Sequence, residues 1–146
     1  MIKVKVINKS KNELPTYKYP YDSGMDVRAD VSEPIVIPAG QRKIIPTGLY
    51  FQIPKGYEIQ IRPRSGLAAK KGVFVLNTPA TIDCGYTGEL LVILMNLGPT
   101  DFLVEPGDRI AQIVLQEVPH MDLEEVQEFT EDVERGENGL GSTGIK

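Results

Sequence analysis

The stretch TGLYFQIPKGYEIQI, residues 47–61, decides the fold class of this chain. Two short runs of apolar or alternating residues, 47–53 and 57–61, lie on either side of a turn from Pro54 to Gly56. Runs of this length and pattern favour β-strands, and a proline with a glycine between them ends a strand instead of interrupting it. The two runs are therefore predicted to be consecutive strands.

The same pattern recurs along most of the chain. Comparable runs occupy residues 2–7, 35–37, 73–76, 90–96, 102–104 and 109–118, and most of the 11 prolines and 14 glycines lie in turns between them. About eight short strands with such turns predict an all-β domain, a jelly-roll-like β-sandwich or barrel. One short helix is predicted over residues 65–71, with Ser65 as its N-cap.

The composition suits a single domain followed by an arm. A chain of 146 residues, 41% of them hydrophobic, can form one core that buries roughly two thirds of the unfolded surface. After Val118 the sequence becomes acidic and holds too few apolar residues for a second core. We expect one domain over residues 1–130 and a mobile C-terminal arm over residues 131–146.

The charge pattern favours a small anionic ligand. The net charge is -4, and no basic stripe runs along the chain, which argues against a nucleic-acid polymer as partner. The basic residues Arg62, Arg64, Lys70 and Lys71 form a local cluster instead. A cluster of this kind can hold one anionic group.

The sequence also predicts a compartment. The N-terminal run does not have the order of a signal peptide, and no apolar run approaches the ~20 residues of a membrane span. Cys84 is the single cysteine, which agrees with a reducing compartment, and with His120 as the single histidine no Cys and His metal cage can form. We expect a soluble, cytoplasmic protein with no membrane partner.

Two segments carry donors that a phosphate requires. The tail RGENGLGSTG, residues 135–144, combines four glycines with the cation of Arg135 and the hydroxyls of Ser142 and Thr143. The segment RPRSGLA, residues 62–68, places two arginines and a hydroxyl immediately before the predicted helix. The second segment has an alternative interpretation, an ordinary strand end with solvated arginines and a serine cap.

A third segment, TIDCGYTGE at residues 81–89, carries a candidate base. Asp83 lies three residues before Tyr86, and the glycines on both sides of Tyr86 leave its ring exposed for a sugar or a base. His120 precedes the acidic stretch and is interpreted as a surface residue, so the expected general base is a carboxylate. The alternative is that Tyr86 caps the core and Asp83 bonds a turn.

Five segments in order resemble the five motifs of the trimeric dUTP diphosphatases, the dUTPases. The segments are DSGMD at residues 22–26, which could alternatively be a loop before a strand at Val27, and then residues 64–68, 82–89, 107–112 and 135–144. The resemblance implies the dUTPase-like β-clip, a jelly roll. It also implies hydrolysis of dUTP to dUMP and pyrophosphate with Mg²⁺, an activity that limits uracil in DNA and supplies dUMP for dTMP synthesis.

The resemblance further implies a homotrimer with active sites between subunits, in which the arm completes a neighbouring site. Asp83 would orient and deprotonate the water that attacks the α-phosphorus, and Tyr86 would pack on the deoxyribose and exclude a 2′-hydroxyl. Asn77 would read the uracil edge inside a β-hairpin. The backbone of Thr81, Ile82 and Asp83, with the strand around Leu91, would complete a pocket too tight for thymine.

The remaining implied residues bind phosphates and metal. Arg64, Ser65, Gly66 and Gln112 match phosphate-contacting positions, while Arg135, Gly141, Ser142 and Thr143 match a clamp on the γ-phosphate. Asp26 would act on Mg²⁺ through water, since this ion keeps several waters and takes phosphate oxygens as ligands. The chain departs from the family in having Leu140 where an aromatic residue usually stacks on uracil, and Gly85 where many members have a second aspartate.

Three alternatives accompany this interpretation. A dCTP-deaminating relative would need a proton shuttle beside the pyrimidine amino group, for which Glu89 is the remaining candidate. A non-catalytic dUTP-binding regulator would not need Asp83. A structural jelly-roll trimer would leave the glycines of the arm and Arg135 without a role.

Overall fold

The computed structural model describes residues 1–129 and forms an antiparallel β-sandwich. Within this range the elements are β1 (Lys5–Asn8), β2 (Met25–Arg28), β3 (Ile35–Ile37), β4 (Arg42–Gln52), β5 (Tyr57–Arg62), α1 (Ser65–Lys71), β6 (Val73–Val75), β7 (Ala80–Ile82), β8 (Glu89–Asn96), β9 (Phe102–Val104) and β10 (Arg109–Glu117). The prediction of an all-β chain with one short helix is confirmed. No helix in the described range is long and apolar enough to cross a membrane.

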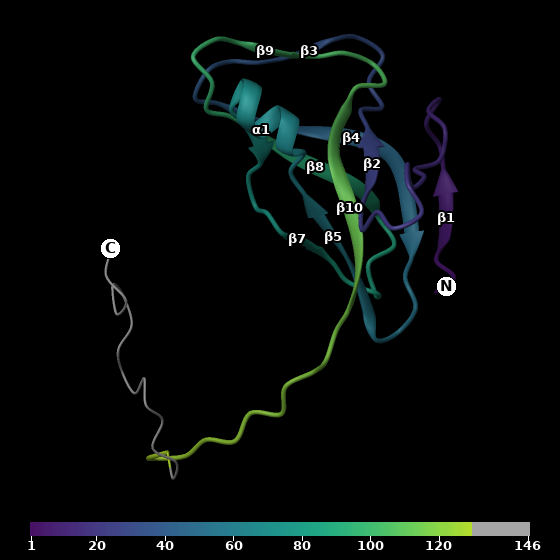
Figure 1. Ribbon diagram of the computed structural model, residues 1–146, viewed down its shortest axis with the longest axis vertical. Helices are drawn as coiled ribbons and strands as arrows, with labels where there is room; N and C mark the ends of the chain where they lie inside the picture. The colour runs from purple at the N-terminus through teal and green to yellow at the C-terminus, as the bar shows by residue number, and fades with distance from the viewer. Residues whose placement is uncertain (130–146) are drawn as a thin grey trace.

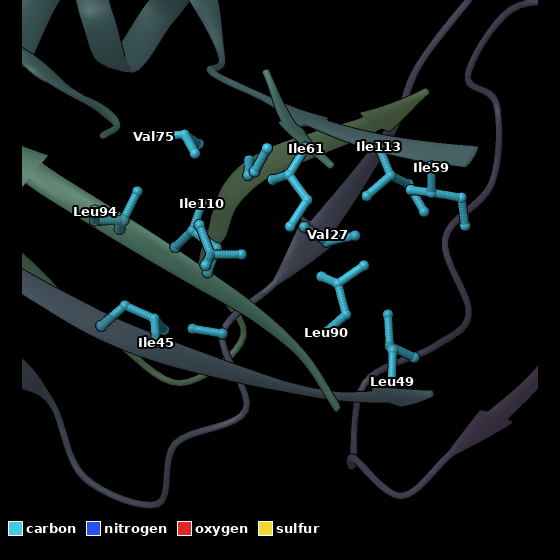
Figure 2. Packing of buried hydrophobic residues seen from close by; sticks show 14 of the residues in the cluster. Val27, Ile45, Leu49, Ile59, Ile61, Val75, Leu90, Leu94, Ile110 and Ile113 are labelled. Carbon is cyan, nitrogen blue, oxygen red and sulfur yellow. The ribbon is translucent and has the colours of Figure 1, made fainter. Parts of the chain in front are cut away.

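The strands form two four-stranded sheets and a small ribbon. One sheet has the order β1-β4-β8-β6, the other has the order β2-β10-β5-β7, and β3 pairs with β9 (Figure 1). Figure 2 shows the core between the two sheets. Its labelled members from β4, β6 and β8 are Ile45, Leu49, Val75, Leu90 and Leu94, and those from β2, β5 and β10 are Val27, Ile59, Ile61, Ile110 and Ile113. The expected sandwich is thus observed.

The inner strand β8 has the alternating burial pattern that its sequence predicts for a strand. Leu90, Val92, Leu94 and Asn96 are buried, whereas the residues between them are half-buried or exposed. This period of two is the pattern of a strand with one face on the core. The buried Asn96 donates from Nδ2 to the carbonyls of Ile37 and Thr100, both at 2.9 Å, so its amide nitrogen is satisfied.

Replacing Leu90 with alanine is expected to lower the free energy of unfolding by about 2–5 kcal/mol, because the side chain is 1% exposed and would leave a cavity. Urea denaturation measures this change. The control is Leu97→Ala, at a side chain that is 64% exposed, which is expected to change stability by ~0.5 kcal/mol or less. Equal losses in both variants would contradict the assignment of Leu90 to the core.

Strand β4 differs from its prediction. It starts at Arg42 and passes through Pro46, although the prolines were expected to end strands. The ladder with β8 shifts register between Pro46 and Tyr50, and Gly48 within the shift has φ +67°. Pro46 pairs with Leu91 as the last residue before this shift, and proline is tolerated in a strand at such a bulge, where the regular ladder ends.

Two further expectations need correction. Strand β7 was not predicted, because its sequence Ala-Thr-Ile holds a single large apolar residue. Ser65 is not the N-cap of α1, because Arg64 holds that position with φ -88° and ψ 126° and Ser65 is the first helical residue. The helix ends at Gly72, which has φ 67° and donates its N–H to the carbonyls of Leu67 and Ala68.

Candidate active site

A cationic cluster lies where β2, β10 and β5 run side by side. The register places Asp26 of β2 opposite Gln112 of β10, and Gln112 opposite Arg62 of β5. Arg64 follows β5 and donates from Nε to Oδ1 of Asp26 at 3.0 Å. Its Nη1 donates to the backbone carbonyl of Arg109 at 3.1 Å. The guanidinium of Arg64 is therefore fixed by two of its donors.

Asp26 stands between two arginines. Nε of Arg109 lies 3.8 Å from Oδ2 of Asp26, on the other side of the carboxylate from Arg64. The side chains remain partly open to solvent, at 31% for Arg64, 37% for Asp26 and 49% for Arg109. Each guanidinium thus keeps donors that can reach an anion from solvent.

Gln112 holds the segment that precedes α1. Its Nε2 donates to the carbonyl of Pro63 at 2.9 Å. Gly24 lies against the same side chain, and a Cβ at this position would overlap Oε1 of Gln112. A side chain at this position would therefore have to displace the amide end of Gln112. The predicted phosphate residues Ser65 and Gly66 lie at the start of α1 and are exposed.

Two clefts flank the cluster. One has a volume of about 570 Å³ and runs between the segment 10–24 and β2, with Asp26, Arg109 and Gln112 in its lining. The other has a volume of about 540 Å³ and is lined by Arg28, Arg64 and Arg109 together with Leu67 of α1. The residues on β2 and β10 are thus accessible from two directions.

The candidate base lies on the connection from β7 to β8. Asp83 is exposed, and its carbonyl accepts the N–H of Tyr86 at 3.0 Å, which closes a turn. Tyr86 is 44% exposed, and its hydroxyl donates to the carbonyl of Glu89 at 2.9 Å. A Cβ on Gly88 would lie 2.5 Å from the hydroxyl oxygen of Tyr86, so the Tyr86 side chain lies close against the backbone of Gly88. The turn presents a carboxylate and an aromatic ring together.

The expected β-hairpin around the base pocket is not a simple hairpin. Strand β7 belongs to the sheet of β5, whereas β8 belongs to the sheet of β4 and β6, so their connection passes from one sheet to the other. Asn77 is exposed in the connection from β6 to β7. Thr81 is exposed and Ile82 half-buried on β7, and Leu91 on β8 is 41% exposed.

The cationic cluster and the candidate base lie at opposite ends of β5. Ala80 pairs with Ile61 and Ile82 with Ile59, so β7 runs away from Arg64 and Asp83 follows its far end. The offset along β5 is about six residues, or ~20 Å at the rise of a strand. Figure 1 shows β5 pointing toward α1, with the connection from β7 to β8 at the other end. One chain therefore does not bring both groups around one phosphate chain.

Sequence reasoning missed three contacts in these clusters. Arg109 falls within the predicted segment 107–112 without a role of its own, and its position beside Asp26 follows from the β2 and β10 register. The contact of Gly88 with Tyr86 was not foreseen. The Glu89 side chain, considered for a deaminase, accepts the N–H of Gly48 in β4 at 2.8 Å and is engaged there.

The predicted clamp residues Arg135, Leu140, Gly141, Ser142 and Thr143 lie outside the described residues, as does the predicted boundary after residue 130. Within residues 1–129 no three side chains of His, Cys, Asp or Glu gather into a set that could hold a metal ion. Asp26 can still accept hydrogen bonds from metal-bound water, because a carboxylate has about four lone-pair sites and the two guanidiniums occupy only part of them.

Comparison with known proteins decides the family. The family model described as dUTPase matches residues 3–144. The chain belongs to the dUTPase family. Two bacterial dUTPase relatives carry the description deoxyuridine 5′-triphosphate nucleotidohydrolase. The protein of Fusobacterium nucleatum is 48% identical over 143 residues, covering 98% of this chain and 97% of the relative. That of Chlamydia muridarum is 53% identical over 135 residues, covering 92% and 93%.

Solved dUTPase structures share the fold. The dUTPase of Staphylococcus bacteriophage 80alpha with dUPNHPP has a TM-score of 0.89 and 26% identity, covering 99% of this chain and 100% of the phage chain. A mutant dUTPase of Staphylococcus aureus phage phi11 has a TM-score of 0.79 at 22% identity, covering 89% and 100%. That phage protein is described as coordinating a structural Mg(II) ion.

Proposed function

We propose that this protein hydrolyses dUTP to dUMP and pyrophosphate. The observation that carries the proposal is the near-complete match to nucleotidohydrolases of deoxyuridine triphosphate at about 50% identity. The geometry supports the same reaction, since the chain presents a solvent-exposed carboxylate beside an aromatic ring and a separate arginine cluster. These are the groups that a water attack on a nucleoside triphosphate requires.

The chemistry assigned to Asp83 is general base catalysis. Asp83 takes a proton from water as the water oxygen bonds to the α-phosphorus in line with the leaving group. The bond from the α-phosphorus to the bridging oxygen breaks, and pyrophosphate leaves with that oxygen. A positioned base of this kind contributes ~10²–10⁴-fold in rate. The exposed position of Asp83 supports this role, because water can reach its carboxylate.

The nucleoside is assigned to the surface around β7 and β8. Asn77 reads the uracil edge, Tyr86 packs on the deoxyribose, and the backbone of Thr81, Ile82 and Asp83 with Leu91 closes the pocket. The exposure of Asn77, Tyr86 and Leu91 supports this assignment, since each can contact a ligand from solvent. Leu140 would cover the base by apolar contact.

The phosphates are assigned to the arginine cluster and the C-terminal residues. Arg64, Ser65, Gly66 and Gln112 bind the phosphate chain, and Arg135, Gly141, Ser142 and Thr143 hold the γ-phosphate. The two contacts that fix Arg64, to Asp26 and to the Arg109 carbonyl, support the first assignment because they leave the remaining donors at a defined position. Mg²⁺ supplies charge neutralisation when bound, held by phosphates and water, with Asp26 acting through water.

The complete site is assigned to a homotrimer with active sites between subunits. The ~20 Å offset between Asp83 and Arg64 supports this assignment, since one triphosphate cannot reach both within one chain. Exposed apolar side chains after β10 support it too, with exposures of 85% for Met121, 85% for Leu123 and 92% for Phe129. Side chains exposed in this way are available to pack on a neighbouring subunit.

Mixing inactive subunits is expected to restore activity if Asp83 and Arg64 act from different subunits. Asp83→Asn and Arg64→Ala proteins, unfolded together in equal amounts and refolded, would carry both native residues at about a quarter of the shared sites. Pyrophosphate release measures the restored sites. Each variant refolded alone is the control, and a mixture no more active than the controls would place both residues in one chain's site.

A pyrophosphate-release assay across dUTP, dTTP, dCTP and UTP with Mg²⁺ tests the proposed function. Hydrolysis of dUTP alone is the expected result. Ammonia released from dCTP would identify a deaminase instead, and binding of a non-hydrolysable dUTP analogue without turnover of dUTP would identify a regulator.

A further inference from the structure

Glu89 joins two parts of the molecule that the proposed reaction does not connect. Its side chain is half-buried, and Oε1 accepts the N–H of Gly48 at 2.8 Å. Its backbone carbonyl accepts the hydroxyl of Tyr86 at 2.9 Å. One residue therefore contacts the β4 bulge with its side chain and the sugar-binding tyrosine with its backbone.

The β4 bulge, the register shift between Pro46 and Tyr50, is held in place by close packing. Gly48 has φ +67°, and a Cβ there would lie 2.7 Å from Cβ of Ser10 and 2.8 Å from Oδ2 of Asp30. The Gly48 carbonyl accepts the N–H of Lys9 at 2.8 Å. Beside it, Thr47 is 1% exposed and its hydroxyl donates to the carbonyl of Leu90 at 2.6 Å. The Gly48 N–H is thus presented from a tightly packed segment.

The Tyr86 ring is supported from one side. Its hydroxyl oxygen and the ring carbon that bears it would lie 2.5 and 2.6 Å from a Cβ on Gly88, so the ring is seated on the backbone of that glycine. Tyr86 remains 44% exposed, which leaves surface for a ligand. The hydrogen bond from the Tyr86 hydroxyl to the Glu89 carbonyl restrains sideways movement of the hydroxyl end of the ring.

We propose that Glu89 is a positioning residue for sugar recognition. Its carboxylate ties the end of the β7 to β8 connection to the β4 bulge, which places the Glu89 carbonyl where the Tyr86 hydroxyl requires it. The ring then lies at a defined distance from the deoxyribose and excludes a 2′-hydroxyl. This inference rests on the proposed function, in which Tyr86 packs on the sugar. Discrimination depends on such placement, because a ring that can move aside admits the larger sugar.

The test compares Glu89→Ala with Glu89→Gln by the ratio of kcat/KM for dUTP to kcat/KM for UTP. Glu89→Ala is expected to lower this ratio by about tenfold, because the hydrogen bond from the Gly48 N–H to the Glu89 carboxylate is lost. For dUTP itself, the fall in kcat/KM is expected mainly as a rise in KM. Glu89→Gln is expected to keep the ratio within about twofold, because the amide oxygen accepts the same N–H. Glu33→Ala, at an exposed residue of the loop before β3, is the matched control.

A structural role alone would give a different result. A lower melting temperature in Glu89→Ala with an unchanged dUTP to UTP ratio would overturn the proposal. If Glu89→Ala does not fold, Tyr86→Phe removes the same hydrogen bond from its other end and should lower the ratio in the same direction. An unchanged ratio in that folded variant would equally overturn the proposal.

The failure of the proposed function is recognised separately. Absence of dUTP turnover in the wild-type protein would refute the function before any variant is compared.

The position of the Tyr86 ring is measured independently from the NMR signals of ¹³C-labelled tyrosine, with the Tyr86 signal assigned through Tyr86→Phe. A shift in Glu89→Ala and none in Glu89→Gln is expected, and identical spectra would overturn the positioning role.

Discussion

Replacing Asp83 with asparagine is expected to lower kcat for dUTP by ~10²–10⁴-fold, while KM changes by only about threefold. The amide has nearly the shape of the carboxylate but cannot take a proton from water. Asp83 is exposed on a turn closed by the Tyr86 N–H, so the substitution leaves no buried group without a partner. Steady-state kinetics of pyrophosphate release measure both parameters.

The control for this variant is Asp122→Asn, which removes the same charge from an exposed residue after β10. It is expected to retain wild-type kcat. Retention of activity by Asp83→Asn would place the base elsewhere, and a common loss in both variants would indicate a general effect of charge. A rise in KM alone would make Asp83 a binding residue.

The sequence predicts strands best where proline or glycine residues mark the turns on both sides of a short apolar run. The predicted runs 35–37 and 102–104 agree with β3 and β9, because proline or glycine lies close to each run. The same signals fail inside β4, where Pro46 lies in the strand. The tolerance of Pro46 depends on a register shift against β8, a partner 45 residues further along the chain. A pattern of neighbouring residues carries no information about such a partner.

In the candidate site, too, local sequence identifies some features and strand pairing determines others. The types of residue at Asp26, Arg64 and Gln112 predict phosphate chemistry, but only the order β2-β10-β5 brings Asp26 to Arg64 across 38 positions of sequence. The role of Arg109 beside Asp26 follows from that register and not from its motif. The offset between Asp83 and Arg64 likewise requires the antiparallel pairing of β7 with β5. Sequence motifs identified the chemical groups, and strand pairing determined which groups meet.

Ending the chain after Glu134 is expected to abolish turnover of dUTP while leaving the fold and the oligomeric state unchanged. The removed residues include Arg135, Ser142 and Thr143, which supply a cation and two hydroxyls for the γ-phosphate in the proposed site. The buried apolar core of residues 1–129 lies between Val27 and Val114, so the truncation removes none of it. The melting temperature is therefore expected to change by ~2 °C or less.

Pyrophosphate release, thermal unfolding and sedimentation measure the three properties of the truncated protein. A matched control replaces residues 135–146 with glycine and serine residues of the same number, which keeps the length but removes Arg135. This control is expected to be as inactive as the truncated protein, because length alone supplies no cation. Turnover by the control would show that the donors of residues 135–146 are unnecessary. Dissociation of the truncated protein would instead assign those residues to assembly, since loss of a phosphate clamp leaves subunit contacts intact.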